Sequence, residues 1–153
     1  MRRALAAAAF AALCSLGAPA PAASLPPGWI ADPTSGCRVW NNYPNADDRI
    51  GFQGHCAGGY AQGAGVVHWF SNGRNYETDR GYFQRGKLAG HAAILDERGA
   101  FYGTFANNRP NGVGTFRRKD GQAFSGVWKQ GCFDHAGRRE HFFRTAAECG
   151  FAR

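Results

Sequence analysis

The chain has 153 residues, 22 of them glycine and 14% of them aromatic, and it carries a formal net charge of +7 at pH 7. This length suits one domain, and the high glycine and aromatic content favours β structure over a helical bundle. The sequence contains no G-x-x-x-x-G-K-[ST], G-x-S-x-G or H-E-x-x-H motif, which argues against nucleotide-binding, serine-hydrolase and zinc-protease sites of those types.

Residues 1–22 are predicted to form a cleaved signal peptide. Arg2 and Arg3 precede a run of small and apolar residues, and Ala20-Pro21-Ala22 supplies an A-x-A cleavage site. A membrane anchor is the alternative, but the apolar run is shorter than the roughly 20 residues that a spanning helix needs. Cleavage would remove two arginines and lower the formal charge from +7 to +5. We therefore expect export to the periplasm or the extracellular space, with no transmembrane span after cleavage.

Residues 23–51 are expected to form a lead-in and a first strand. The segment SLPPGWIADPTSG contains three prolines and should be extended. The following segment CRVWN is typical of an edge strand. Trp29 and Ile30 of the lead-in are candidates to fold across the sheet face opposite the glycines discussed below.

The cysteines indicate two disulfides. Cys14 belongs to the leader, which leaves an even number in an exported chain. Four cysteines allow three pairings, and we favour Cys37–Cys56 with Cys132–Cys149 because each bond would close a short loop at one end of the chain. Zinc binding would instead require closely spaced cysteine pairs, which are absent.

An internal repeat occupies residues 52–131. Four segments place a glycine between residues that are mostly aromatic: FQGHC, DRGYF, FYGTF and FSGVW. Further glycines follow the first three segments at similar spacing. The positions that define the repeat are Phe52, Gly54, Gly63, Gly65, Gly81, Phe83, Gly90, Phe101, Gly103, Phe105, Gly112, Gly114, Phe124, Gly126 and Trp128.

This pattern resembles the MORN repeat (membrane occupation and recognition nexus), in which Tyr-x-Gly-x-Trp-x-x-Gly is followed by Gly-x-Gly and a later glycine. Three positions depart from it: Asp79 and Cys56 replace aromatic residues, and Ala92 replaces the second glycine of its pair. The resemblance implies a series of β-hairpins and a binding or scaffolding role without chemistry of its own. The family name also suggests association with a membrane.

The spacing also has a physical explanation. Alternate residues of a strand share a face, so Phe101, Gly103 and Phe105 should point to one side, and the turn formers in NNRPNG should separate this strand from the next. A glycine between two rings leaves a trough that a ring from a neighbouring strand can cover. One hairpin alone is marginally stable, whereas several stacked hairpins can form a stable sheet. We predict an all-β fold: an elongated single-layer antiparallel meander of MORN-type hairpins with its ends stapled by disulfides.

Residues 132–153 are expected to cap this array. The segments GCF and GRREHFF can form a last hairpin around the turn DHAG. Thr145 and Glu148 have capping-box spacing, and Gly150 supplies a stop signal. One short C-terminal helical turn is therefore predicted.

No residue stands out as catalytic. His55, His68 and His91 should lie on the strand face opposite the glycines, where we prefer ordinary sheet residues over a metal-binding or proton-handling cluster. The adjacent acids Asp47–Asp48 and Asp96–Glu97 are interpreted as solvated loop residues, although two separated carboxylates beside a cleft could cleave a glycosidic bond.

The face opposite the glycines is the candidate interaction surface, because apolar, aromatic and basic residues should mix there. Basic runs at strand ends can contact an anionic partner, and they can also simply mark a solvated sheet edge. The candidate binding residues are Tyr82, Tyr102, Arg109, Arg117, Arg118, Lys119 and Lys129.

We therefore expect a non-catalytic, exported binding or scaffold module that needs no cofactor or metal. Its partner would be a protein or an anionic envelope component, such as lipid headgroups or a cell-wall polymer, and not nucleic acid. The alternative is a small envelope hydrolase acting on cell-wall glycan, which would need a cleft with converging histidine and carboxylate groups. A third hypothesis is a structural subunit that oligomerises by edge pairing.

Overall fold

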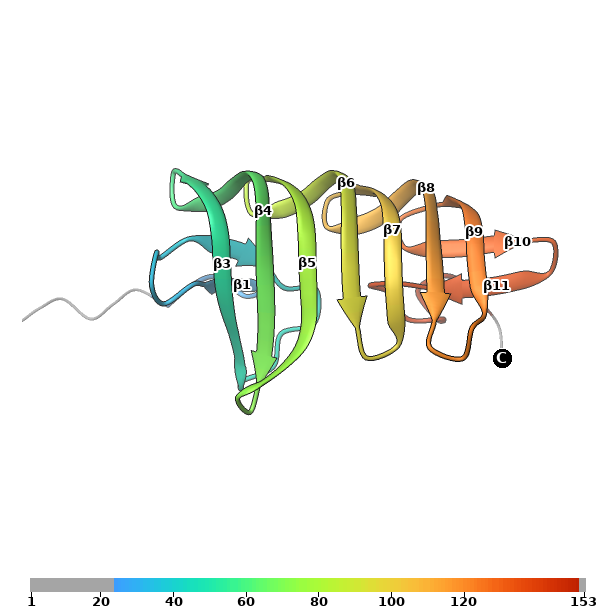
Figure 1. The fold of residues 1–153 in the computed structure, drawn as a ribbon, viewed down its shortest axis with the longest axis horizontal. Coiled ribbons are helices and arrows are strands. Elements are labelled where there is room, and N and C mark those ends of the chain that lie inside the picture. The colour runs from blue at the N-terminus through green and yellow to red at the C-terminus, as the bar shows by residue number, and fades with distance from the viewer. Residues whose placement is uncertain (1–23, 152–153) are drawn as a thin grey trace, which may run out of the picture.

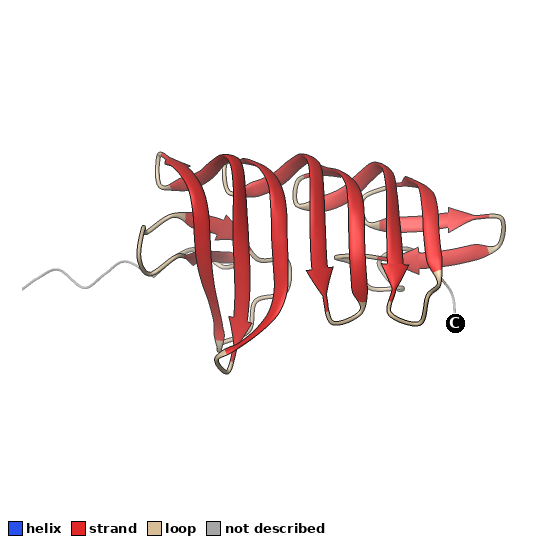
Figure 2. Ribbon diagram, in the orientation of Figure 1, coloured by secondary structure: helices blue, strands red, loops and turns tan. Residues whose placement is uncertain are grey.

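The computed structural model describes residues 24–151, so the predicted signal peptide at 1–22 lies outside the described residues. The described chain is all-β, as predicted from the sequence (Figure 2). Within residues 24–151 no helix is long and apolar enough to cross a membrane. The strands are β1 (Trp29–Ala31), β2 (Arg38–Trp40), β3 (Asp48–Ala57), β4 (Tyr60–Ser71), β5 (Arg74–Gln84), β6 (Lys87–Asp96), β7 (Gly99–Ala106), β8 (Arg109–Arg118), β9 (Ala123–Trp128), β10 (Cys132–His135) and β11 (Arg138–His141).

The strands β3 to β9 follow one another as an antiparallel meander within a nine-stranded sheet (Figure 1). The short strands β1 and β2 pair antiparallel, and a single parallel bridge between Arg38 and Tyr60 attaches them to β4. The predicted last hairpin forms a separate two-stranded sheet from β10 and β11. The long axis of the molecule therefore runs across the strands of the meander.

A row of small residues crosses the sheet from β3 to β9. Each member is in register with the next: Gly54, Gly65, Gly81, Ala92, Gly103, Gly114 and Gly126. A Cβ atom added to Gly103 would lie 2.5 Å from the Cα of Gly114, and one added to Gly114 would lie 2.6 Å from the Phe101 ring. These contacts are too short for a side chain, which explains why glycine recurs at this spacing.

Aromatic rings occupy the space above this row. A Cβ added to Gly54 or Gly65 would lie 2.7 or 2.8 Å from the ring of Phe52. At the other end of the sheet, a Cβ added to Gly126 would lie 3.1 Å from the ring of Phe133 in β10. The rings thus come from the same strand, from the neighbouring strand and from the C-terminal hairpin.

The side of the sheet that carries the glycine row, here called the inner face, holds the hydrophobic core. Its largest fully buried side chains include Phe83, Phe101, Phe116 and Trp128. The centroid of the Phe101 ring is 5.1 Å from that of Phe142, which follows β11. Figure 1 shows β1 (blue) and the β10–β11 hairpin (orange to red) behind the meander. The meander is therefore one layer whose inner face is covered at both ends by the terminal segments.

The lead-in covers the inner face and not the opposite one, so the placement considered for Trp29 and Ile30 is wrong. Ile30 packs against the buried core, and the Trp29 ring makes edge contacts with Trp40 and Tyr60, with centroids 5.3 and 4.9 Å apart. The reason is the pairing of β1 with β2. Ile30 is in register with Val39, whose side chain is buried in the same core.

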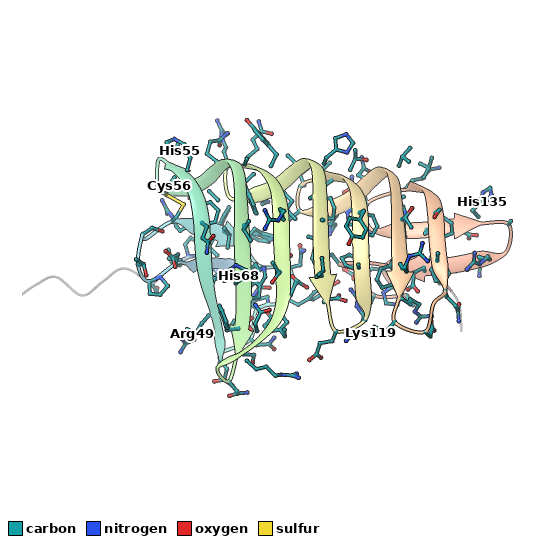
Figure 3. The ribbon with its side chains drawn as sticks, in the orientation of Figure 1. Arg49, His55, Cys56, His68, Lys119 and His135 are labelled. Carbon is teal, nitrogen blue, oxygen red and sulfur yellow. A yellow bond between two sulfur atoms is a disulfide. The ribbon has the colours of Figure 1, made fainter. Side chains whose placement is uncertain are left out.

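Both predicted disulfides are confirmed. Cys37, directly before β2, is bonded to Cys56 in β3 (Figure 3), and Cys132 in β10 is bonded to Cys149 near the C-terminus. The bonds span 19 and 17 residues of sequence. A loop of this length corresponds to a stabilisation of about 3 kcal/mol per bond through restriction of the unfolded chain. The first bond connects the N-terminal cover to β3, and the second crosslinks the C-terminal cover internally, so each cover has its own disulfide.

Two local predictions differ from the structure. The reciprocal hydrogen bonds of the capping box form between Thr145 and Glu148, at 2.7 and 3.1 Å, but residues 146–150 make consecutive turns and the predicted helical turn is not shown. Gly150, with a φ of +69°, reverses the chain before a helix can continue. The turn expected across NNRPNG is confined to Asn107 and Asn108, which both have positive φ.

Substitution of Gly103 by alanine should destabilise the protein by about 1–3 kcal/mol, because a single methyl group would collide with the backbone of β8. Urea unfolding measures this free energy. Gly51→Ala is the matched control, since its added methyl group would meet only the Phe70 ring at 3.9 Å. Equal unfolding free energies for the two variants would contradict the steric explanation of the row.

Candidate functional site

The outer face of the meander, defined as the side of β3–β9 opposite the glycine row, exposes several large apolar side chains. The register brings Arg80, Ala93, Tyr102, Thr115 and Ser125 side by side across β5 to β9. The large apolar and aromatic residues that are more than half exposed are Tyr82, Leu95, Tyr102, Val113 and Val127. Val113 and Val127 face each other across β8 and β9, so the apolar surface is continuous there.

Charge is separated between the two faces of the meander. Arg49, Arg80 and Arg117 lie at outward positions, which alternate with buried inward ones. None of the outward positions of β3–β9 carries a carboxylate. The four carboxylates of these strands lie at inward positions: Asp48, Glu77, Asp79 and Asp96. The outer face therefore combines basic and apolar groups without acidic ones.

The predicted binding residues do not all meet on this face. Tyr82, Tyr102 and Arg117 lie on it, whereas Arg118, the next residue along β8, points to the inner side. The Nε atom of Arg118 is 3.3 Å from the carboxylate of Glu140 in β11. The separation of Arg117 from Arg118 follows from strand geometry, because adjacent residues of a strand face opposite sides.

The other three predicted residues lie near the ends of strands. Lys119 is exposed in the turn after β8, at the edge of the sheet in Figure 3. Arg109 begins β8, is half-buried and has a buried Nε atom without a hydrogen-bond partner. Lys129 follows β9 and is exposed. These residues therefore lie apart from the patch around Tyr102.

The histidines of the meander are dispersed along it. His55 and His91 are exposed, and His68 is half-buried with its Nδ1 atom 3.2 Å from Thr78 Oγ1. Their cross-strand partners are not histidines. In Figure 3, His135 lies at the tip of the C-terminal hairpin, far from His55 and His68. Residues 24–151 contain no group of three His, Cys, Asp or Glu side chains placed to hold a metal ion.

A cavity of about 140 Å³ on the inner face brings together residues that the sequence analysis did not connect. Trp69 of β4 and three residues of β5 (Tyr76, Glu77 and Asp79) form the wall supplied by the sheet. The opposite wall comes from the end of β2 and the segment after it, from the β7–β8 turn and from the C-terminal segment: Trp40, Asn41, Asn42, Tyr43, Asn45, Asn108 and Phe143. The cavity thus exists only because the N- and C-terminal covers close over the sheet.

Two acids at the base of this cavity are in an unusual environment. Asp79 is only 2% exposed, and its Oδ2 atom accepts a 2.8 Å hydrogen bond from Trp69 Nε1. Its Oδ1 atom is buried and has no fixed donor. Glu77, two residues earlier on the same strand, hydrogen-bonds to Asp79 when one of the two carboxyls is protonated. Strand periodicity therefore places both carboxyls on one face and in contact.

Burial is the main cause of altered ionisation here. It raises the pKa of Asp79 to about 7, even though the hydrogen bonds from Trp69 and Glu77 lower it. Burial, followed by the negative charges of Asp79 and Asp96, raises the pKa of Glu77 well above its usual range. The pair therefore retains a proton near neutral pH, where exposed carboxyls are ionised.

The interpretation of the acids as solvated loop residues is wrong for Asp48 and Asp96. Asp48 is buried and accepts hydrogen bonds from Asn41 Nδ2 at 2.7 Å and Tyr76 at 3.3 Å. The Asp96 side chain is largely buried and ion-paired with Arg98 at 2.8 Å. Asp48 is the first residue of β3 and Asp96 is the last residue of β6, so both acids lie within strands and on the inner face of the sheet.

One signal in the sequence could have located the cavity. Asp79 occupies a position where the other repeat units carry an aromatic residue, and that position faces the core. A carboxyl at a ring position must be buried, so this departure marks the site. The residues of the opposite wall carry no comparable signal, because their position depends on how the terminal segments fold back.

Comparison of the chain with known proteins found no matching family model and no matching curated protein.

The stability of the protein should depend on pH through Asp79. Because the pKa of Asp79 is about 7 in the folded protein and near 3.8 in the unfolded chain, the folded state binds more protons between these values. Stability should therefore fall as pH rises from about 4 to about 7, by up to about 1.4 kcal/mol per pH unit for one proton. Asp79→Asn should flatten this slope in urea unfolding measured at several pH values.

Asp134→Asn is the matched control for this experiment, since Asp134 is exposed on β10 and lies outside the cavity. It should leave the slope as in the wild type. A slope that is the same for Asp79→Asn and the wild type would exclude the unusual ionisation of the cavity pair.

Proposed function

We propose that the protein is an exported MORN-like binding module that uses its outer face to contact an anionic component of the cell envelope. The observation that carries this proposal is the separation of charge described above. Arginines occupy the outer face of the meander, and the carboxylates of the same strands are turned to the inner face. An anion approaching the outer face would therefore meet basic groups on strands that turn no carboxylate toward it.

The exposed apolar residues support a surface for contact with another molecule. Tyr102, Val113 and Val127 are each more than half exposed, although they lie in a regular sheet with a full core on its other side. Interfaces combine such apolar and aromatic groups with arginine. Near an anionic surface, each arginine contributes about 1 kcal/mol. Arg80 and Arg117 on either side of Tyr102 would together contribute about 2 kcal/mol.

Glycan hydrolysis has less support than binding. A glycosidase needs two carboxyls at least about 5 Å apart, with the scissile bond between them. Glu77 and Asp79 extend from the same face of one strand and share a hydrogen bond when one is protonated, which leaves no space for a glycosidic oxygen between them. The cavity therefore favours holding a ligand over cleaving a polymer.

The double variant Arg80→Gln/Arg117→Gln should bind anionic vesicles about 30-fold more weakly than the wild type, because about 2 kcal/mol of attraction is lost. Cosedimentation with phosphatidylcholine vesicles containing phosphatidylglycerol measures this. Wild-type binding should decrease with added salt, since exposed charges are screened over about 10 Å at 0.1 M ionic strength. Soluble polyphosphate in place of the vesicles tests whether the anion must be part of a membrane.

Arg138→Gln/Arg139→Gln is the control, because it removes the same charge from the C-terminal hairpin and leaves the outer face intact. It should bind like the wild type. Failure of the wild type to bind either anionic probe in low salt would refute the proposal. Equal weakening by both double variants would also refute it, because net charge and not the outer face would then be responsible.

A further inference from the structure

The cavity on the inner face contains a buried hydrogen-bond acceptor without a fixed donor. Asp79 lines the cavity, and its Oδ1 atom has no donor in the protein beyond the proton shared with Glu77, while Oδ2 is already bonded to Trp69. A buried acceptor without a fixed donor costs stability, and the cost is greater when the acceptor is charged. A molecule that donates a hydrogen bond inside the cavity would remove this cost.

The other polar groups of the wall already have partners within the protein. Asn41 donates to Asp48 at 2.7 Å and accepts from the Tyr43 amide at 2.9 Å. Asn108 accepts from the Leu88 amide at 3.0 Å. The side chains of the asparagines thus hold the terminal covers in place. This leaves the two carboxyls of β5 as the groups free to bind a ligand.

The remaining walls are aromatic and suit an organic cation. Trp40, Trp69, Tyr43 and Tyr76 line the cavity together with Phe143, and the faces of tryptophan and tyrosine rings attract cations. A cavity of about 140 Å³ is comparable to one that accommodates a six-membered ring. An adjoining hollow of about 340 Å³ shares Tyr43, Tyr76, Glu77 and Phe143 with this cavity and adds residues from the β6–β7 loop.

We propose that this cavity binds a compact organic ammonium ion, with its N–H groups donating to Asp79 and Glu77 and its apolar body of about six heavy atoms between the aromatic walls. An ammonium ion fits better than a neutral alcohol for two reasons. It carries up to three donors and no acceptor, which matches two carboxyls in contact. It also compensates the charge that burial otherwise penalises.

Binding would displace the proton that the two carboxyls share. The ammonium ion enters with its charge, both carboxyls become ionised, and one proton leaves to solvent, so charge balances in the exchange. The inference does not depend on the function proposed for the outer face.

Other charged and titratable groups surround the pair of carboxyls and come from every neighbouring element. They are Asp48 on β3, Asp96 on β6, Arg98 and Glu97 in the β6–β7 loop, Tyr76 on β5, Tyr43 after β2 and Arg144 near the C-terminus.

Cyclohexylammonium chloride and cyclohexanol form a matched pair of probes, because they have the same ring and differ in charge. Isothermal titration calorimetry should detect saturable binding of the amine at pH 8 and much weaker binding of the alcohol. Amine affinity should fall about tenfold for each pH unit below about 7, where the proton competes. Titrations in buffers with different ionisation enthalpies should show release of about one proton near neutral pH.

Asp79→Asn should abolish amine binding, and Glu77→Gln should weaken it and remove the proton release. Asp134→Asn and Arg80→Gln/Arg117→Gln should bind the amine like the wild type, which separates this inference from the outer-face proposal. Circular dichroism verifies that each variant is folded. The inference is overturned if the wild type binds no amine, if it binds the alcohol equally well, if affinity is independent of pH, or if folded Asp79→Asn binds normally.

Discussion

The close approach of backbone and ring along the glycine row is the constraint on which the rest of the structure depends. Six of seven adjacent strands carry glycine at one register position and the seventh carries alanine, so that rings such as Phe52 and Phe101 can lie close against the sheet. Burying a ring in this way removes a large apolar area from water. Because the strand pairings share the position, the buried side chains form one hydrophobic cluster along the meander, and each hairpin is stabilised by its neighbours.

A layer of rings on one side of a single sheet needs a cover, and the terminal segments supply it. The β1–β2 hairpin brings Val39 and Ile30 onto the N-terminal part of the core, and the C-terminal segment brings Phe142 against Phe101. Each cover is short and would have few stabilising contacts alone. The disulfides compensate for this, since Cys37–Cys56 joins the N-terminal cover to β3 and Cys132–Cys149 joins β10 to the C-terminal segment within the other cover. Covering both ends also creates the cavity, because the covers meet above β4 and β5.

The sequence was sufficient to predict features that depend on local pattern. The all-β class, the hairpins and the disulfide pairs followed from glycine spacing, strand alternation and the position of the cysteines, as for Cys37 and Cys56. Features that depend on how distant segments meet did not follow. The direction of Trp29 and Ile30 depends on the pairing of β1, and the contact of Arg118 with Glu140 depends on a hairpin that folds back. The cavity was missed because its walls are far apart in sequence.

The second repeat unit departs from the pattern at Asp79. This departure lowers the stability of the fold and provides a polar site. A ring in place of Asp79 would extend the aromatic layer and bury apolar area. The carboxyl instead loses hydration, retains a proton near neutral pH and has no fixed donor for Oδ1. Such a cost is tolerated where the surrounding structure holds the group rigidly, as the indole of Trp69 does here. Since the other three units keep an aromatic residue at this position, the packing of the meander does not itself require an acid. The position of Asp79 therefore points to ligand binding as the reason for the acid.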